Sequence, residues 1–206
     1  MVGIGEQEVV DTASAAIAVL REAVDRGVNH IDTSDYYGPH TVNEVIREAL
    51  HPYPEQLRIV TKVGARCSAD RAWPAALSRP ELVSAVEDNL RNLGLETLDL
   101  VNLRVGTERD GPDDKSIAEP FTVLAELRQA GKIRHLGVSN VTVAQLAEAQ
   151  QIAPVLSVQN RYSVATRHDD ALVETCARQG ISFVGFSGSG FSRALTCAVR
   201  RVLSDQ

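Results

Sequence analysis

Three residues with the chemistry to move a proton onto a carbonyl oxygen fall at or just after the ends of two predicted strands. Asp32 ends one apolar run, Tyr37 follows it five residues later, and Lys62 ends the next apolar run. A free tyrosine titrates near pH ~10, too high for easy proton exchange at neutral pH. A neighbouring ammonium stabilises the phenolate, and a carboxylate beside that ammonium keeps it charged and in place. The set predicts a tyrosine that donates a proton while a hydride arrives at the carbonyl carbon.

Short apolar runs alternate along the chain with segments of helical periodicity. The runs predict six strands, over residues 28–32, 58–62, 98–103, 135–138, 155–159 and 181–186. The periodic segments predict helices over residues 12–25, 42–50, 78–93, 121–131, 143–150 and 169–178. Gly27, Gly131 and Gly180 stand where helices end, because glycine adopts the left-handed conformation that closes a helix. Such alternation indicates a parallel sheet with right-handed crossovers.

The strand spacing favours a barrel. Strand starts lie about 31 residues apart, so eight units would need roughly 245 residues, close to the ~250 of a (β/α)₈ barrel. An open doubly wound sheet is the alternative, although no predicted strand leads into a Gly-x-Gly-x-x-Gly turn. We therefore predict an α/β fold, an incomplete (β/α)₈ barrel with about six of eight strands recognisable. Residues 1–186 would form the barrel domain and residues 187–206 a divergent tail.

In such barrels the chemistry lies at the carboxyl ends of the strands. Besides the first three residues, these ends carry Arg104, Ser139, Asn140, Gln159 and Phe186. Each candidate has a simpler alternative. The alternatives are a turn start for Asp32, a surface aromatic for Tyr37, a solvated strand end for Lys62, a surface ion pair for Arg104, a helix N-cap for Ser139-Asn140 and a core position for Phe186.

The segment around the first candidates resembles the signature of aldo-keto reductases. In Gly27-Val-Asn-His-Ile-Asp32-Thr-Ser-Asp-Tyr-Tyr37-Gly38 a strand ends in Asp and a Tyr follows five residues later, which selects Asp32 over Asp35 and Tyr37 over Tyr36. Further segments similar to the family are Ile59-Val-Thr-Lys62, Gly131-Lys-Ile-Arg-His-Leu-Gly-Val-Ser139-Asn140 and Val158-Gln159-Asn160-Arg-Tyr162. The resemblance covers nearly everything from residue 12 to residue 186.

This resemblance implies reduction of an aldehyde or ketone to an alcohol. Tyr37 would be the general acid, Lys62 would strengthen that acid, and Asp32 would pair with the lysine. The cofactor would be NADPH, bound in extended form at the barrel mouth without a Rossmann domain. Its nicotinamide carboxamide would be held by Ser139, Asn140 and Gln159, with Phe186 against the ring.

The sequence departs from the family pattern in three places. Arg104 stands where the family usually has a histidine; arginine stays charged and only donates, so it can stabilise negative charge but cannot shuttle a proton. This variant resembles a branch of bacterial pyridoxal reductases. Residues 187–206 do not align with the family, whose members carry there an eighth strand and most contacts to the adenosine and its 2′-phosphate. The family's first strand is also missing, so we expect a gap between Val28 and Ile181.

Composition narrows the function classes. The 21 Lys and Arg against 27 Asp and Glu give a net charge of −6, which argues against nucleic-acid binding. No stretch approaches the ~18–20 apolar residues of a membrane span, and the N-terminus lacks a secretory pattern. Three widely spaced cysteines match no zinc or redox motif, so we expect no metal site and a cytoplasmic protein.

Two alternatives to an active reductase stay open. One is a catalytically impaired fragment that keeps the motifs. The other is a non-catalytic binding or regulatory protein of the same fold. The sequence indicates a small carbonyl compound as the partner and does not indicate an oligomeric state.

Overall fold

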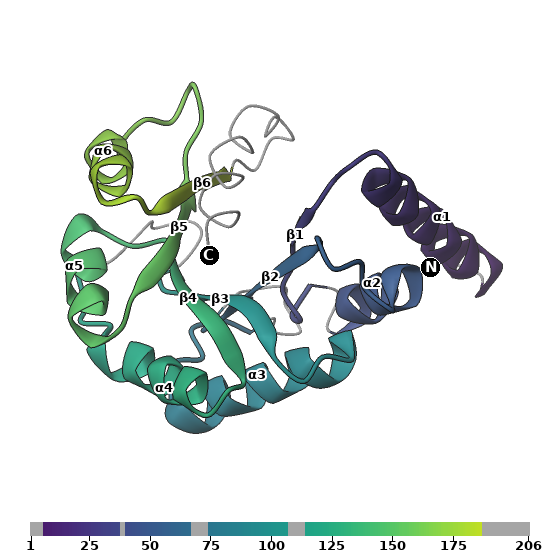
Figure 1. The fold of residues 1–206 in the computed structure, drawn as a ribbon, viewed down its shortest axis with the longest axis horizontal. Coiled ribbons are helices and arrows are strands. Elements are labelled where there is room, and N and C mark those ends of the chain that lie inside the picture. Colours follow the sequence, from purple (N-terminus) through teal and green to yellow (C-terminus); the bar gives the residue numbers. More distant parts are fainter. Residues whose placement is uncertain (1–5, 38–39, 67–73, 107–113, 187–206) are drawn as a thin grey trace, which may run out of the picture.

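Six parallel strands alternate with six helices in the computed structural model (Figure 1). The structure describes residues 6–37, 40–66, 74–106 and 114–186, and side chains from residue 13 onward. The predicted tail, residues 187–206, lies outside these ranges. The strands are β1 (His30–Asp32), β2 (Arg58–Val63), β3 (Leu98–Arg104), β4 (Ile133–Ser139), β5 (Val155–Arg161) and β6 (Ser182–Phe186). The helices are α1 (Glu6–Asp25), α2 (Thr41–Leu50), α3 (Arg79–Leu93), α4 (Ala118–Gln129), α5 (Val143–Ile152) and α6 (Asp170–Gln179).

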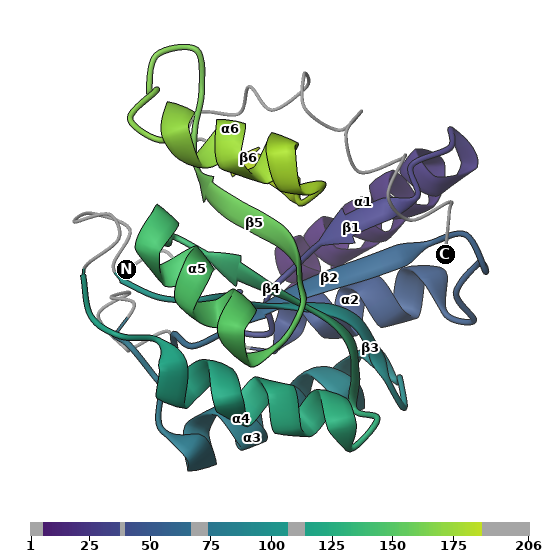
Figure 2. The same ribbon diagram turned by 60° about the vertical axis from the view of Figure 1, so that its left-hand side comes forward.

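The sheet follows the chain, with strand order β1-β2-β3-β4-β5-β6 and every neighbouring pair parallel. It curls into part of a barrel, and the helices lie on its outer side (Figure 1). Figure 2 shows α3 and α4 side by side on that side. Among the described strands, β1 and β6 form the two edges and do not pair with each other. The prediction of an incomplete (β/α)₈ barrel is confirmed.

The six predicted strands are confirmed, with shifted ends. β1 begins two residues later than predicted because Val28 belongs to the turn after α1, where its N–H donates to the carbonyl of Ala23 at 2.9 Å. β4 is longer than predicted because it pairs with β3 along its length, from Leu98 opposite Ile133 to Arg104 opposite Ser139.

Local signals explain where helices begin and end. The N–H of Ser78 donates to Glu81 Oε2 at 3.2 Å, and its hydroxyl donates to the same oxygen at 2.7 Å, so the predicted capping box at the start of α3 is present. Gly27, Gly131 and Gly180 have φ values of +90°, +80° and +70°, the left-handed conformation expected after a helix.

The core lies between the outer face of the sheet and the helices. Its largest fully buried side chains include Leu82 and Leu93 of α3, Leu98 and Leu103 of β3, and Phe121 of α4. Burial of one such side chain stabilises the fold by about 1.5–3 kcal/mol. This layer supports the strands that carry the candidate site residues.

The inner face of the sheet is polar. The hydroxyl of Ser157 donates to Asn102 Oδ1 at 2.7 Å, directly beside Gly137. A side chain at residue 137 would collide with both groups, so glycine lets β3 and β5 side chains meet across β4.

Nearby, burial lowers the pKa of His30; the neighbouring Asp32 opposes this shift.

No helix in the part of the chain that the structure describes is long and apolar enough to cross a membrane.

Candidate active site

Asp32 and Lys62 form an ion pair at the carboxyl ends of β1 and β2. The register places Asp32 opposite Val60, so Lys62 lies one inward-facing position further along. Its Nζ is 2.8 Å from both carboxylate oxygens of Asp32. Lys62 is only 5% exposed, whereas the Asp32 side chain is 32% exposed. A buried ammonium requires a charged partner, which explains why the lysine is held rather than solvated.

Tyr37 lies next to this ion pair. The ammonium of Lys62 is 5.3 Å from the centroid of the Tyr37 ring, and the tyrosine is 39% exposed. Tyr36 has a different environment, since burial and the nearby carboxylates of Asp88 and Asp35 raise its pKa. Of the two adjacent tyrosines, Tyr37 is the one beside the Lys62 ammonium and in the wall of a cavity.

Gln159 joins the site from β5. Its Nε2 donates to Asp32 Oδ2 at 2.9 Å, whereas its buried Oε1 has no hydrogen-bond partner. The buried hydroxyl of Ser139, opposite Gln159 on β4, also has no partner. In native protein structures, buried polar atoms rarely lack a hydrogen-bond partner. A carboxamide group has both a donor and an acceptor, so the nicotinamide of a dinucleotide fits these two atoms.

Asn140 is fixed immediately after Ser139. It has a left-handed backbone, with φ +61°, and its Nδ2 donates to the carbonyl of Val105 at 2.8 Å. The alternative that Ser139-Asn140 caps the next helix is wrong. Thr142 is the N-cap, because its hydroxyl accepts from the N–H of Gln145 at 3.2 Å and its own N–H donates to the Gln145 side chain. Ser139 is therefore not committed to capping.

Arg104 and Phe186 close the opposite side of the site. The guanidinium carbon of Arg104 lies 5.5 Å from the centroid of the Phe186 ring. Gly64 helps to place Arg104, since at φ +108° its Cα approaches the Arg104 carbonyl so closely that any side chain would collide with it.

Most of the predicted residues line one cavity of about 140 Å³. Its wall consists of Asp32, Ser34, Tyr37, Lys62, Val63, Ala65, Arg104, Gln159 and Phe186. Ser139 and Asn140 are not part of the wall but follow the end of β4 beside Gln159, whose carbonyl accepts from the Asn140 N–H at 3.0 Å. The structure thus gathers all eight predicted residues at the carboxyl ends of the strands.

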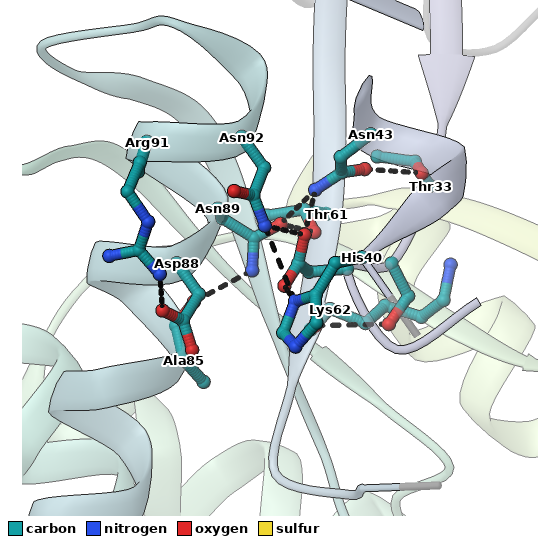
Figure 3. A network of polar contacts seen from close by, with 12 residues as sticks. Thr33, His40, Asn43, Thr61, Lys62, Ala85, Asp88, Asn89, Arg91 and Asn92 are labelled. Carbon is teal, nitrogen blue, oxygen red and sulfur yellow. Dashed lines mark hydrogen bonds and ion pairs between the residues drawn. The ribbon is translucent and has the colours of Figure 1, made fainter. Parts of the chain in front are cut away.

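The sequence analysis missed a second polar cluster next to this site. We call it the asparagine network, and Figure 3 shows most of it. Its members are Thr33, Asp35, His40, Asn43, Thr61, Asn89 and Asn92. One signal was available: Asn89 is three residues after Val86 and four before Leu93, which places it on the buried face of the predicted helix.

Comparisons with known proteins match one family over most of the chain. The model of the aldo/keto reductase family matches residues 2–194. The chain is 56% identical over 172 residues to a pyridoxine 4-dehydrogenase of Escherichia coli, covering 83% of this chain and 60% of the relative.

Two solved structures have the same fold. An aldo-keto reductase of Bacillus halodurans in its holo form superimposes with a TM-score of 0.72 at 27% identity, covering 84% of this chain and 57% of the other. A Klebsiella pneumoniae aldo/keto reductase in complex with NADP and acetate gives a TM-score of 0.70 at 24% identity, with 84% and 58% covered. The chain therefore spans about 60% of the length of the relatives it matches.

Proposed function

The chain belongs to the aldo/keto reductase family, and we propose that it reduces an aldehyde or ketone to an alcohol with NADPH. The observation that carries this proposal is the Asp32–Lys62 ion pair, with the ammonium 5.3 Å from the centre of the Tyr37 ring. A carboxylate, an ammonium and a phenol in this order can deliver one proton to a carbonyl oxygen.

Each member of the set has a separate task. Tyr37 donates the proton from its Oη to the substrate oxygen. Lys62 stabilises the phenolate that remains, because its positive charge lies beside the ring. Asp32 keeps the buried lysine charged and fixed through two contacts of 2.8 Å.

Arg104 takes the position at which the family usually has a histidine. It stabilises the negative charge that develops on the carbonyl oxygen and does not transfer a proton, since a guanidinium stays protonated. Its place in the cavity wall, over Phe186, supports this task.

The cofactor proposal rests on the unpaired buried atoms. When bound, NADPH supplies the hydride for the carbonyl carbon. Ser139 Oγ and Gln159 Oε1 are buried without partners. The Ser139 hydroxyl would donate to the oxygen of the carboxamide, and Gln159 Oε1 would accept from its NH₂ group. Asn140 would complete this set, and Phe186 would lie against the nicotinamide ring.

For the substrate we propose a pyridine aldehyde of the pyridoxal type, reduced to the alcohol. The support is the likeness to the pyridoxine 4-dehydrogenase. The guanidinium of Arg104, in the cavity wall, can donate hydrogen bonds to the hydroxyl group of such a ring. We place this activity in the cytoplasm and in the barrel unit of residues 1–186.

The test measures NADPH binding and pyridoxal-dependent NADPH oxidation by the purified chain. We expect Tyr37→Phe to lower the oxidation rate roughly 10²–10⁴-fold while NADPH binding stays within two-fold. Tyr36→Phe is the matched control and should keep the rate within two-fold. Binding of NADPH without oxidation by the wild type would favour the non-catalytic binding protein, and loss of both in a folded sample would favour the impaired fragment.

A further inference from the structure

Residues 35 and 40, which flank Tyr37 along the chain, contact each other, and we call this pair of contacts the closure. The backbone N–H of His40 donates to the carbonyl of Asp35 at 2.7 Å. The side chains of the same two residues meet as well, with His40 Nδ1 2.5 Å from Asp35 Oδ2. The N–H of Tyr37 donates to the carbonyl of Ser34 at 2.9 Å. Asp35 lies between these two residues along the chain, so its contacts hold the backbone that leads to the tyrosine.

Asp35 is the centre of the closure. It is 1% exposed, and its Oδ1 accepts from Asn43 Nδ2 at 3.0 Å and from Asn92 Nδ2 at 2.9 Å. With His40, its partners come from the start of α2, from α2 itself and from α3. One carboxylate thus ties the turn to two helices. Because a carboxylate only accepts hydrogen bonds, the N–H donors around it suit it better than they suit an amide.

The asparagine network continues from Asp35 to the strand that carries Lys62. Asn43 Nδ2 also lies 2.9 Å from Asn89 Oδ1, and Asn89 Oδ1 accepts from the hydroxyl of Thr61 at 2.6 Å. Thr61 is the neighbour of Lys62 on β2, and its side chain faces the opposite side of the sheet (Figure 3). The turn with Tyr37 and the strand with Lys62 are therefore held by one hydrogen-bonded framework.

We propose that Asp35 is a positioning residue, which holds the Tyr37 turn so that the phenol stays beside the Lys62 ammonium. Asp35 is not part of the cavity wall and acts only through the turn. The inference rests on the proposed function, in which Tyr37 is the acid. Tyr37 follows Asp35 by two residues, and a displacement of about 1 Å in a reacting group can cost 10²-fold in rate.

The first variant is Asp35→Asn, which keeps the shape of the side chain but replaces one carboxylate oxygen, an acceptor, with an NH₂ group, a donor. We expect kcat for pyridoxal to fall roughly 10–100-fold, whereas the KM for NADPH stays within two-fold because its proposed contacts come from residues at the ends of β4, β5 and β6. The matched control is Asp88→Asn on α3, whose carboxylate pairs with Arg91. It should keep kcat within two-fold.

The second pair of variants tests the same closure from the solvent side. His40 has a φ of +71°, a conformation that both Gly and Asn tolerate. Asn carries an amide at the position of the imidazole Nδ1 and can donate to Asp35, whereas Gly cannot. We expect His40→Gly to lower kcat about ten-fold and His40→Asn to restore it to within about three-fold of the wild type.

A readout that needs no turnover separates this inference from the proposed function. Because Lys62 Nζ lies over the Tyr37 ring, 5.3 Å from its centroid, we expect the ring to shift the NMR signal of the Lys62 ε-CH₂ protons. Tyr37→Leu gives the value without a ring. We expect Asp35→Asn and His40→Gly to move the shift toward the Tyr37→Leu value, with His40→Asn close to the wild type. If the wild type does not oxidise NADPH, the proposed function fails and this shift alone decides the inference.

Three results would overturn the positioning role. One is an unchanged Lys62 shift in Asp35→Asn. Another is an Asp35→Asn variant that unfolds at a lower urea concentration but has the wild-type kcat per folded molecule. The last is equal kcat values for His40→Gly and His40→Asn.

Discussion

Two carboxylates three residues apart, Asp32 at the end of β1 and Asp35 in the turn that follows, have opposite surroundings. The Asp32 side chain is 32% exposed, borders a cavity and is paired with an ammonium and an amide. Asp35 is 1% exposed, lies outside the cavity wall and accepts from three N–H donors. Asp32 belongs to a cluster that borders a cavity and can bind a ligand. Asp35 belongs to a cluster whose hydrogen bonds are satisfied within the protein.

The unpaired atoms show the same difference. Among the described residues, the buried side-chain atoms without a partner are His30 Nδ1, Ser139 Oγ and Gln159 Oε1. None belongs to the asparagine network. A saturated network stabilises the fold, whereas unpaired buried groups raise its free energy until a ligand satisfies them. Variants of the two clusters should therefore affect different quantities.

The largest expected effect is on the rate of NADPH oxidation, and it comes from a variant in the cluster of Asp32 and Lys62. Lys62→Met should lower the rate of NADPH oxidation by roughly 10²–10⁴-fold, because the charge beside Tyr37 is lost. The free energy of unfolding should change by less than about 2 kcal/mol, since methionine fills most of the space and Asp32 reaches solvent. Urea unfolding and initial rates measure the two quantities. Lys132→Met, at the exposed pair with Glu87, is the control for both.

The next effect is on stability, and it comes from a variant in the asparagine network around Asp35. Asn89→Ala should lower the free energy of unfolding by about 2–4 kcal/mol, because Asn89 is fully buried and its loss leaves the Thr61 hydroxyl and one N–H of Asn43 without an acceptor. Its kcat per folded molecule should fall less than that of Asp35→Asn. An unchanged urea midpoint would contradict the assignment of Asn89 to the stabilising cluster.

Two adjacent hydroxyls sharpen the comparison at a smaller scale. Thr33 donates to Asn43 Oδ1 at 2.9 Å, whereas Ser34 makes only a long contact of 3.4 Å with the carbonyl of Lys62. Thr33→Val should cost about 1–2 kcal/mol of unfolding free energy and Ser34→Ala about 0.5 kcal/mol. Equal losses, measured by urea unfolding of both variants, would mean that the two clusters do not differ in this way.

The smallest effect is on the titration of His30, below the Asp32–Lys62 pair. Burial lowers its pKa from 6.5, Asp32 opposes the shift and Lys62 adds to it. NMR should show a lower His30 pKa in Asp32→Asn and a higher one in Lys62→Met. Because the unfolded chain binds the proton more readily, the fold loses stability as pH falls below 6.5. His30→Gln should flatten that part of the stability curve, and an equally steep curve would contradict the assignment.

The sequence was sufficient to predict the strands and the residues at their carboxyl ends. Branched apolar runs and helix-ending glycines report local conformation, and parallel strands bring their carboxyl ends together whatever the details of packing. The resemblance to the family then separated Asp32 from Asp35 and Tyr37 from Tyr36, a choice that spacing without a family pattern leaves open.

The asparagine network could not be predicted in the same way. Polar residues in a helix usually face solvent, and Asn89 differs only in lying on the apolar face. That Asn43 of α2 and Asn92 of α3 both reach Asp35 depends on how two helices pack, which no local pattern contains. The N-cap at Thr142 was missed because Ser139 and Asn140 have equally suitable side chains.

The order of the strands in the sheet bears on how the chain folds. Each strand pairs with its successor along the chain, so most of the sheet can form by adding one neighbouring unit at a time, with low entropic cost of loop closure. The hydrogen bond from Gln159 to Asp32 is different, since it joins residues 127 positions apart. It can form only after β1 to β5 have assembled and curled. The end of the barrel that carries the candidate site is thus expected to become native late in folding, after the layers that support it.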